Sequence, residues 1–595
     1  MKGEAVLGVE RSVSGKFWSD RSGLNDAALE RQGLAISQRY GLAPMVGRLV
    51  AARDIPLEMV ERYLSPTLKD ELPDPSLFKD MDKAAARIAD VVEAGGGIGV
   101  FADYDVDGGT SAAQFIRYLR SIDVPTFLHI PDRQDEGYGP NLPALRSLKE
   151  RGAALVLCLD CGTLSIDVLG EATAEGIETI VVDHHMAAPD LPNCVAVVNP
   201  NRLDEDGAFG HLAACGVSFV TLVAVSRALR ERGWFERTGR KEPALLQLLD
   251  LVALGTVCDV VPLTGLNRAF VSQGLKVQAG RQNIGMAALG DIAGLRRKPD
   301  PFAAGFMLGP RINAGGRVGR AELGARLLST HDPDEARSLA KELDELNNER
   351  REIEAEVLAQ ALRLAEAQEN DPIIMVAGEG WHQGVVGIVA SRLKDRYARP
   401  SCVITIEEGE AKGSGRSVAG IDLGAAVIAA AQAGLLSKGG GHKMAAGFSL
   451  EAEKIEAFRD FLRERVSETL DGELPPAPLS VDAILSPGAA NSGLLEDISK
   501  LEPFGTANPE PRLVLRDALL EGVGMVGEAH VRATIVGPDG AKVKAIAFRV
   551  AEDERGQQML SNAGTRFHIA GHLRRDDYRG GNAVQFVIDD LAEAG

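Results

Sequence analysis

The stretch GGIGVFADYDVDGG, residues 96–109, decides the fold, because an apolar run ends there in three aspartates, Asp103, Asp105 and Asp107. Helix-like segments precede and follow it, and the alternation of apolar strand and amphipathic helix continues to about residue 185. This alternation predicts a parallel sheet whose strands are joined by right-handed helical crossovers.

Three further segments carry acid or imidazole groups at or just past the end of an apolar run. They are Asp160 in LVLCLDCGT (155–163), Asp183-His184-His185 in IETIVVDHHM (177–186) and Asp259 in LVALGTVCDVVPL (251–263). The carboxyl ends of parallel strands gather at one edge of a sheet, where such sheets bind ligands. We therefore expect at least five carboxylates and two imidazoles to meet in one place. Carboxylates that close together stay ionised only if cations lie among them.

The chemistry of these ligands favours Mn²⁺ or Mg²⁺, because carboxylates with one or two imidazoles and no thiolate suit hard cations. Two such ions roughly 3.5–4 Å apart can activate a water and stabilise the leaving oxygen of a phosphoryl ester. A calcium loop is the alternative for DYDVDG alone, but a helix-like segment follows it and the glutamate of an EF-hand is missing. Cys158 and Cys161 form one CxxC pair, but the second pair that a zinc site needs is absent.

The order of DYDVDG, LDCG, DHH and GTVCDVVPL resembles the DHH phosphoesterase superfamily. The later segments FMLGPRINAGGRVG, WHQGVVGIVASRL, GSGRS and GGGHKMAAGF resemble its RecJ branch, the single-strand-specific DNA exonucleases. The resemblance runs from about residue 17 to the C-terminus. It implies a metal-dependent hydrolase that removes 5′-mononucleotides from single-stranded DNA in the 5′-to-3′ direction, in DNA repair and recombination.

The resemblance also implies a role for each residue of the acidic cluster. We expect five groups to bind metal directly, namely Asp105, Asp107, Asp160, His184 and Asp259. Asp103 and His185 are expected either to bind metal or to orient the other ligands. One position departs from some superfamily members, which carry a histidine four residues before the middle aspartate of the first motif. Here that residue is Phe101.

Later motifs offer groups that can hold the phosphates of a substrate. Guanidinium groups form bidentate hydrogen bonds with phosphate oxygens, and glycines let a backbone approach phosphate closely. A triple-glycine loop before His442 can also wrap a phosphate with backbone N–H groups. For His382, packing beside Trp381 is an equally good interpretation. The candidate substrate-binding residues are Arg311, Asn313, Arg317, His382, Ser414, Arg416, Ser417 and His442, and the resemblance suggests a 5′-phosphate pocket at GSGRS.

The fold class that we predict is α/β: a parallel-sheet domain joined by a long helix to a smaller α/β domain, followed by a barrel resembling the OB fold. The long helix has an apolar stripe interrupted by Arg350, and either a packed strut or a coiled-coil dimer would use it. Phe548 and Phe586 are expected in the barrel core, and Tyr578 is one of its few other aromatics. The expected parts are a helical lead-in (1–78), a DHH catalytic domain (79–331), a connecting helix (332–369), a DHH-associated substrate-binding domain (370–470) and the OB-like barrel (471–595).

The bulk composition is that of a globular protein, with 45% hydrophobic and 25% charged residues, and 595 residues predict about two to four domains. No apolar run reaches the roughly 18 residues of a membrane helix, and the N-terminus lacks a secretory pattern. With its six cysteines mostly in apolar stretches, we expect a reduced, cytoplasmic protein. The net charge of −20 is a weak argument against a nucleic-acid partner, because phosphate affinity depends on local basic patches.

Three functions compete for this pattern. The first is the exonuclease, with single-stranded DNA as substrate and a single-strand-binding protein and a helicase as further partners of an expected monomer. The second is a phosphodiesterase of cyclic or short oligonucleotides, which needs neither the lead-in nor the barrel. The third is a catalytically inactive scaffold, and the intact metal-binding positions argue against it.

Overall fold

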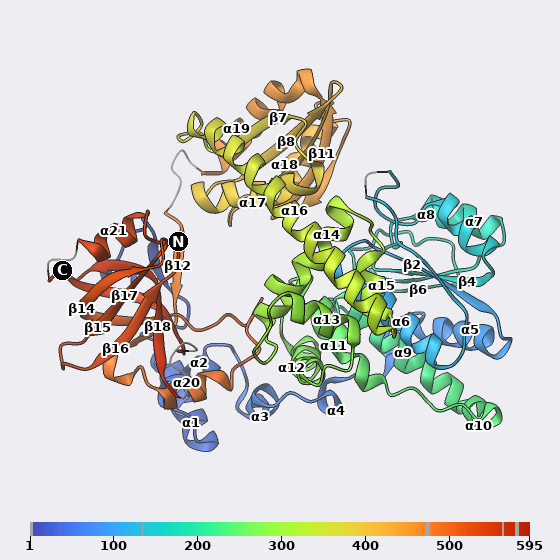
Figure 1. Cartoon of the computed structure of the whole chain (residues 1–595), viewed down its shortest axis with the longest axis horizontal. Coiled ribbons are helices and arrows are strands. Elements are labelled where there is room, and N and C mark those ends of the chain that lie inside the picture. Colours follow the sequence, from blue (N-terminus) through green and yellow to red (C-terminus); the bar gives the residue numbers. More distant parts are fainter. Residues whose placement is uncertain (1–3, 134, 471–475, 562–563, 577–581, 595) are drawn as a thin grey trace. The chain divides into compact units, whose positions relative to one another are not determined.

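A five-stranded parallel sheet contains the residue 96–109 segment, and its strand order is β3-β2-β4-β5-β6 (Figure 1). The computed structural model describes residues 4–133, 135–470, 476–561, 564–576 and 582–594. The strands are β2 (Gly97–Ala102), β3 (Thr126–His129), β4 (Ala153–Leu159), β5 (Thr179–Val182) and β6 (Ala196–Val198). The predicted parallel sheet is confirmed. From β2 the next strand, β3, lies on one side and β4 lies on the other, so the direction in which strands are added changes between β2 and β4. The carboxyl ends of these two strands flank the crevice where such sheets bind ligands.

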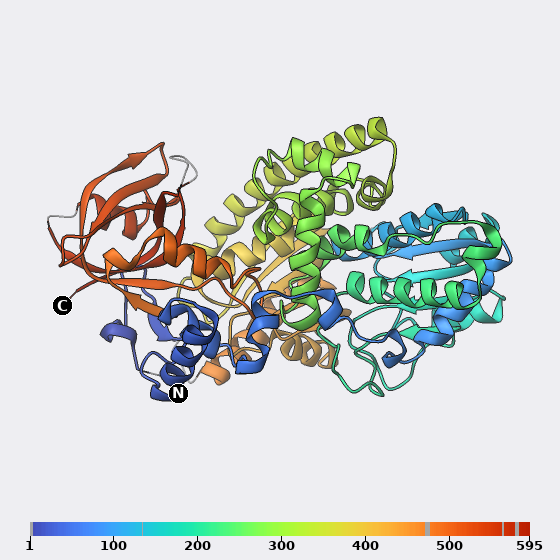
Figure 2. The same ribbon diagram turned by 90° about the horizontal axis from the view of Figure 1, so that it is seen from below.

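Helices cover both faces of this sheet (Figures 1 and 2). On one face, α7 and α8 share a core with Phe101, Val156 and Val181, and the other face carries α5, α6 and α9. Because both faces are covered, β2 and β5 are buried along their whole length rather than at alternate residues. The bounds are α5 (Met81–Glu93), α6 (Val106–Ser121), α7 (Leu142–Glu150), α8 (Ile166–Ala174) and α9 (Ala214–Glu231).

The predicted long helix is confirmed as α16 (Pro333–Glu366), a single helix of 34 residues. Asp332 caps it, because its carboxylate accepts from the backbone N–H groups of Asp334 and Glu335. The Glu335 carboxylate accepts from the Thr330 hydroxyl, and the Asp332 N–H also donates to the Thr330 oxygen, so Glu335 does not bond back to the Asp332 N–H. The carboxylate cap alone therefore satisfies the first turn of α16.

Arg350, which interrupts the apolar stripe of α16, is buried and paired inside the chain. Its guanidinium donates to the Glu354 carboxylate and to the Asn347 amide oxygen. The stripe itself packs against α13, α14, α15 and α17. The helix is therefore the packed strut of the two expected arrangements, and its buried charges, Arg350 and Glu354, pair with each other.

The second predicted α/β part is also confirmed, as a five-stranded sheet in the order β10-β11-β9-β8-β7. Only β7 and β8 are parallel, and the other pairs are antiparallel. Its elements are β7 (Ile374–Glu379), α17 (Gln383–Tyr397), β8 (Ser401–Glu407), β9 (Glu410–Arg416), α18 (Leu423–Gln432), β10 (Lys438–His442), β11 (Ala445–Glu451) and α19 (Ile455–Leu470).

The triple glycine before His442 is not the loop that we predicted. It forms β10, which pairs with β11 in a hairpin. A Cβ on Gly441 would lie 2.4 Å from the Ala445 carbonyl oxygen, and one on Gly439 would lie 2.8 Å from a Leu436 methyl carbon. The glycines thus allow close packing of the hairpin, and their backbone N–H groups are not arranged around a phosphate.

The C-terminal strands form the predicted OB-like barrel. Their order is β13-β14-β15-β16-β18-β17, and pairing between β14 and β17 closes the barrel. Phe586 lies in its core as predicted, but the prediction for Phe548 was wrong, because that ring is 49% exposed and packs edge-on against His530. Tyr578 and residues 471–475 of the expected linker lie outside the described residues. The strands are β13 (Ala483–Leu485), β14 (Leu513–Val526), β15 (His530–Val536), β16 (Lys542–Ala547), β17 (Arg566–Arg575) and β18 (Val584–Glu593).

The barrel shares its core with the start of the chain. Ile36, Val46 and Leu49 belong to the same apolar cluster as the barrel strands, and β1 (Phe17–Asp20) pairs in parallel with β12 (Pro478–Val481). The buried Trp18 indole N–H donates to the Asp590 carboxylate at 2.9 Å. Most of the expected lead-in therefore folds with the C-terminal barrel.

The chain divides into two compact units. The larger comprises Asp74–Asp259 and Gly274–Pro475, and the smaller comprises Met1–Pro73, Val260–Gln273 and Pro476–Gly595. Among the described residues, no helix combines the length and apolar character needed to cross a membrane. The helices not yet named are α1 (Ala27–Tyr40), α2 (Pro44–Ala51), α3 (Val60–Leu64), α4 (Leu68–Glu71), α10 (Trp234–Thr238), α11 (Leu249–Cys258), α12 (Gly265–Ala279), α13 (Ile284–Ile292), α14 (Gly309–Val318), α15 (Leu323–Ser329), α20 (Ser492–Ser499) and α21 (Glu554–Leu560).

The contact between Trp18 and Asp590 gives a test of this shared core. Trp18→Phe keeps the ring but leaves the buried Asp590 Oδ2 without its donor, which typically costs about 1–3 kcal/mol. We expect the urea midpoint of the smaller unit to fall, as followed by hydrogen exchange of the barrel amides. Ser14→Ala, which removes the donor to the other Asp590 oxygen at a less buried position, is the milder control. An unchanged midpoint for Trp18→Phe would mean that the N-terminal segment does not stabilise the barrel.

Candidate metal centre and phosphate site

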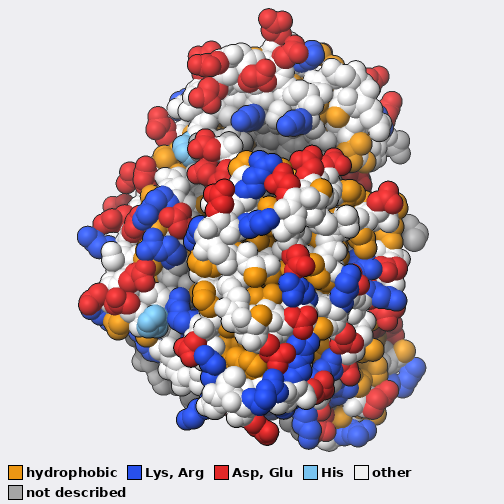
Figure 3. Space-filling view, turned by 90° about the vertical axis from the view of Figure 1, so that its right-hand side faces the viewer, with side chains coloured by type: hydrophobic (Ala, Val, Ile, Leu, Met, Phe, Trp, Pro, Cys, Tyr) orange, Lys and Arg blue, Asp and Glu red, His pale blue; other side chains and the backbone are white. Residues whose placement is uncertain are grey.

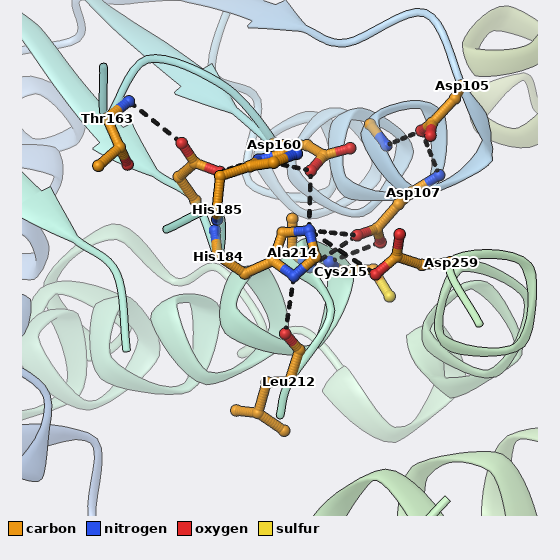
Figure 4. Close-up of polar contacts among 12 residues, drawn as sticks. Asp105, Asp107, Asp160, Thr163, His184, His185, Leu212, Ala214, Cys215 and Asp259 are labelled. Atoms are coloured by element: carbon orange, nitrogen blue, oxygen red, sulfur yellow. Dashed lines mark hydrogen bonds and ion pairs between the residues drawn. The ribbon is translucent and has the colours of Figure 1, made fainter. Parts of the chain in front are cut away.

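Three strand ends bring most of the acidic cluster together (Figure 4). Asp103 directly follows β2, Asp160 directly follows β4, and Asp183-His184-His185 directly follow β5. The Asp103 N–H donates to Leu159 at the end of β4, so the two neighbouring strand ends are tied together. The cluster thus occupies the crevice at which the strand order reverses.

Helix N-termini orient the next two carboxylates. Asp105 caps α6, and its carboxylate accepts from the N–H groups of Asp107 and Gly108. The Asp107 carboxylate accepts from the N–H groups of Ala214 (2.7 Å) and Cys215 (2.9 Å) at the start of α9 (Figure 4). The positive end of each helix dipole stabilises the ionised carboxylate that it holds.

Asp259 reaches the same site from a helix rather than from a strand. It is the C-cap residue of α11, which contacts α6 and α9. Its side chain lies 3.7 Å from His184, between Asp259 Oδ2 and His184 Nε2. The sequence prediction that Asp259 joins the cluster agrees with this placement, but the expected strand end is wrong, since the apolar run before it is a buried helix.

His184 lies at the centre of the cluster with one ring nitrogen directed toward the carboxylates. Its Nδ1–H donates to the Leu212 carbonyl oxygen at 3.0 Å, which leaves the Nε2 lone pair free to bind a cation. Nε2 lies 3.4 Å from Asp160 Oδ1 and 3.9 Å from Asp107 Oδ2. The backbone carbonyl thus fixes the tautomer that a metal-binding histidine needs.

Asp183 organises the two histidines and does not face the cluster. Its carboxylate accepts from the backbone N–H groups of Thr163, His184 and His185 and from the His185 ring at 2.8 Å. Burial opposes ionisation of Asp183, but these hydrogen bonds outweigh burial and hold its pKa below the usual value. The same contact outweighs burial at His185 and raises the pKa of its ring to about 9. The Tyr138 hydroxyl lies 3.3 Å from the same ring.

The remaining carboxylates are electrostatically unsatisfied without a cation. Burial and then the neighbouring aspartates raise the pKa values of Asp103, Asp105 and Asp160, and raise that of Asp259 to about 9. One buried oxygen on each of Asp103, Asp160 and Asp259 accepts no hydrogen bond from any described residue. Ions of charge +2 at this place would remove both penalties, so the donor set fits hard divalent cations.

The described residues form three groups whose ligand atoms lie within 4.8 Å of one another. Asp160 belongs to two of them, and so does His184. The groups are Asp103-Asp105-Asp160, Asp160-His184-His185 and Asp107-His184-Asp259. This sharing is what two adjacent cations with a common ligand require. Phe101, by contrast, is buried and stacks on His129 in the sheet, so it adds no ligand.

A cluster of arginines adjoins the acidic cluster. Burial, and then the charges of Arg133, Arg350 and Arg416, lower the pKa of Arg317 to about 10, and only Asp105 opposes this. The Arg317 guanidinium donates to the Gly384 carbonyl oxygen at 2.9 Å. Burial and then Arg133 also lower the pKa of Arg416. Guanidinium groups gathered at a buried site repel one another, and a bound phosphate would relieve that repulsion.

The GPRINAGGR segment is helical. Its residues lie in α14, where a Cβ on Gly316 would be 3.0 Å from the Tyr104 carbonyl oxygen. The glycine therefore lets α14 approach the first motif. Arg317 and Asn313 lie one helical turn apart on the same face, whereas Arg311 is paired with Asp344 at 2.8 Å. Arg311 thus has a structural partner.

The other predicted phosphate-binding residues differ in whether their polar atoms already have partners in the chain. Ser414 and Arg416 lie on β9, and the Arg416 guanidinium donates to the Ser414 hydroxyl at 2.9 Å. Ser417 is buried, and its hydroxyl donates to the Ile421 carbonyl oxygen at 2.8 Å, so that hydrogen already has an acceptor within the chain. His382 caps α17 by accepting from the Gly384 N–H, which places it beside the Arg317 contact.

His442 is exposed at the end of β10. It pairs with Ala445 on β11, which pairs with Arg416 on β9. Two strand spacings separate the His442 and Arg416 backbones, a distance of roughly 9.5 Å. His442 therefore lies near the arginine cluster without contacting it directly.

Sequence reasoning missed three residues of this site: Tyr104, Arg133 and Tyr138. The Arg133 guanidinium lies over the Tyr104 ring, 5.4 Å from its centroid. Arg133 and Tyr138 belong to the segment after β3, another strand that ends at the same edge of the sheet. The strand-end rule that identified the aspartates applies equally to this segment. Asp183 lies in a motif that the sequence did single out, but the motif alone did not indicate its role.

Comparison with known proteins assigns family relationships to three parts of the chain. A family model for the N-terminal domain of the DHH family matches residues 97–256, one for the DHHA1 domain matches residues 354–468, and one for the RecJ OB domain matches residues 481–590.

Similarity to individual proteins extends over nearly the whole chain. The single-stranded-DNA-specific exonuclease RecJ of Salmonella typhimurium is 36% identical over 565 residues, covering 92% of this chain and 96% of that protein. The crystal structure of RecJ from Thermus thermophilus in complex with Mn²⁺ matches with a TM-score of 0.79 and 29% identity, covering 96% of this chain and 79% of that chain. Its complex with Mg²⁺ matches with a TM-score of 0.73 and 28% identity, over 97% and 78%.

The raised carboxyl pKa values predict how stability depends on pH when metal is removed. A carboxyl group with a raised folded-state pKa stabilises the fold below its unfolded pKa of about 4, and that stability is lost as the pH rises through the folded value. For Asp259 the folded value is about 9, and the raised pKa of His185 acts in the same direction. With chelator, we expect the melting temperature to fall steadily between pH 6 and pH 9.

Mn²⁺ should raise the melting temperature most at the high-pH end, because cations neutralise the ionised cluster and bind only the folded state. Asp259→Asn, which removes one titrating group, should flatten the pH dependence of the chelated protein. Equal pH profiles with chelator and with Mn²⁺ would show that the cluster does not hold the cation.

Proposed function

The chain belongs to the RecJ family of DHH proteins, and from that premise we propose that it hydrolyses phosphodiester bonds of single-stranded DNA from the 5′ end, with Mn²⁺ or Mg²⁺ as cofactor. The observation that carries the proposal is the adjacency of two clusters of opposite charge. Asp105 belongs to one of the metal-binding groups, and its charge also raises the pKa of the neighbouring Arg317 guanidinium. A phosphodiester needs cations on its reacting oxygens and guanidinium groups on the neighbouring phosphate.

When bound, two such ions would supply the positive charge that activates a water and stabilises the leaving oxygen. Asp160 and His184 would both help to hold the ions, because each belongs to two of the ligand groups. His184 would contribute Nε2, since Leu212 holds its other nitrogen. The Asp183 carboxylate would orient the His185 ring through their 2.8 Å hydrogen bond, so that His185 can help to hold an ion beside His184.

The arginine cluster would bind the 5′ phosphate of the strand. Arg317 and Arg416 stand on different elements, α14 and β9, and both respond to the charge of Arg133. A terminal phosphate carries more negative charge than an internal phosphodiester, so a site of three guanidinium groups favours the strand end. This would make the enzyme an exonuclease that starts at a 5′ phosphate. Arg317, Arg416, Ser414 and Arg133 are the residues that we propose for this pocket, with Asn313, His382 and His442 at its border.

The alternative phosphodiesterase of cyclic or short oligonucleotides is not favoured. The chain carries the RecJ OB domain at residues 481–590, and barrels of this class bind single strands along several nucleotides. Figure 3 shows acidic and basic side chains interspersed on one face, so the net charge of −20 is not a uniform acidic surface. A monomeric, cytoplasmic enzyme that works with a single-strand-binding protein and a helicase in repair and recombination stays our prediction.

Polarity of degradation tests the function directly. With Mn²⁺ and a 5′-phosphorylated 20-mer labelled at its 5′ nucleotide, we expect labelled mononucleotide as the first product, whereas a 3′ label should remain on progressively shorter strands. Asp160→Ala should abolish turnover yet keep single-strand binding, because the phosphate grip does not depend on the metal ligands. Early release of the 3′ label, or turnover by a metal-replete Asp160→Ala variant, would contradict the proposal.

Arg416→Ala tests the phosphate pocket. Loss of a charge-assisted hydrogen bond typically costs about 1.5–3 kcal/mol, so we expect kcat/KM for 5′-phosphorylated strands to fall roughly ten- to a hundredfold. Strands with a 5′ hydroxyl should lose much less. Arg320→Ala is the matched control, because Arg320 follows α14 but pairs with Glu342 at the surface. Equal losses on both kinds of strand would place the 5′ phosphate elsewhere.

A further inference from the structure

Two neighbouring phenylalanines of the larger unit are exposed on one helical surface. Phe302 is 53% exposed and Phe306 is 68% exposed. Their rings stack, with centroids 5.1 Å apart and an angle of 24° between the planes. Phe306 lies in a π-helical segment, η5 (Ala303–Leu308), which continues directly into α14. Short π-helical segments are frequent at functional sites.

Three consecutive cations precede this pair: Arg296, Arg297 and Lys298, all of them exposed. The Arg297 guanidinium lies over the Phe302 ring, 5.7 Å from the centroid, and pairs with Asp300 at 3.1 Å. Arg296 and Lys298 form no ion pair with any described residue. On a chain with a net charge of −20, stacked aromatics beside unpaired cations have the composition of a single-strand-binding surface.

The helix that carries the pair runs alongside the metal centre. Near the pair, Cys258 donates from its thiol to the Ala304 carbonyl oxygen at 3.5 Å, and the next residue is Asp259. At the other end of α14, Gly316 packs against Tyr104 and Arg317 joins the arginine cluster. The metal ligands from Asp105 to Asp259 therefore lie between the arginine cluster and the phenylalanine pair. At about 1.5 Å per residue, the helix from Phe306 to Arg317 is roughly 16 Å long.

We propose that Phe302 and Phe306, with Arg296, Arg297 and Lys298, form a stacking platform for bases of the single-stranded substrate on the 3′ side of the cleaved bond. This inference rests on the proposed function. With the 5′ end at the arginines, a stacked strand rising about 3.4 Å per nucleotide reaches the platform at about the fifth nucleotide. The rings are already stacked on each other, so a base would bind to a preformed surface. Phenylalanine and arginine are also enriched at protein interfaces, so the position beside the metal ligands is what favours a nucleic-acid strand as the occupant.

The platform can be tested by combining protein and DNA changes. The substrates are a 5′-phosphorylated 12-mer and the same strand with abasic sites at nucleotides 5–7. KM for release of the first nucleotide is measured for the unsubstituted chain and for Phe302→Ala/Phe306→Ala. Base–aromatic stacking predicts that either change alone raises KM roughly tenfold and that the second change adds little to the first. Leu203→Ala, an equally exposed apolar residue (64%), is the matched control and should leave the abasic effect intact.

A second variant tests the cations and keeps both phenylalanine side chains. Replacing Arg296, Arg297 and Lys298 with alanine should lower the slope of log KM against log salt by roughly two, since each phosphate contact of a single strand contributes about 0.7. Additive effects of the phenylalanine and abasic changes, together with an unchanged salt slope, would overturn the proposal and leave a protein partner as the occupant. Absence of any 5′-to-3′ nuclease activity in the unsubstituted chain would instead overturn the proposed function.

Discussion

Mutual repulsion among buried carboxylates is the constraint on which the rest of the site depends. Asp103, Asp105, Asp160 and Asp259 all have raised pKa values because they are buried together. The fold keeps them there by backbone means: strand ends fix Asp103 and Asp160, and helix N-termini hold Asp105 and Asp107. Asp183 differs from these four, because its hydrogen bonds lower its pKa. It therefore orients the two histidines and does not serve as a metal ligand. Bound cations would offset the repulsion and desolvation of the other four carboxylates.

The arginine cluster repeats this design with the opposite sign. Arg317 is half-buried beside other guanidinium groups, which lowers its pKa, whereas the neighbouring carboxylates raise the pKa of Asp160. Each cluster is strained alone, and a phosphorylated strand end with its cations would complement both at once. Preorganised charge of this kind stabilises developing charge in a transition state without further reorganisation. The electrostatic repulsion within each cluster of the free protein thus favours binding of a phosphate together with its cations.

Much of the fold and of the metal centre could be predicted from the sequence, because both follow from short-range patterns. The strand–helix alternation indicated the parallel sheet, and the strand-end rule gathered Asp105, Asp160 and His184. The rest depends on tertiary context. A fully buried helix before Asp259 has the same continuous apolar run as a buried strand, so its type could not be read from periodicity. The triple glycine packs a hairpin against Leu436, which no local signal reveals. Arg133 lies in a segment whose acidic residues do not directly follow the strand end, and Phe548 lies in the turn directly after β16 rather than in the strand.

The smaller unit has a consequence for how the protein is made. Its core combines the first and last segments of the chain, joined by the β1–β12 pair and by Trp18 with Asp590. Because synthesis runs from the N- to the C-terminus, residues 1–73 leave the ribosome long before their barrel partners at 476–595. Ile36, Val46 and Leu49 therefore remain without their native packing during nearly the whole of translation. The intervening larger unit can fold in that interval, and a prematurely ended chain would display an uncovered apolar helix pair that chaperones and proteases recognise. Synthesis of the barrel strands thus buries the apolar surface that residues 1–73 expose until then.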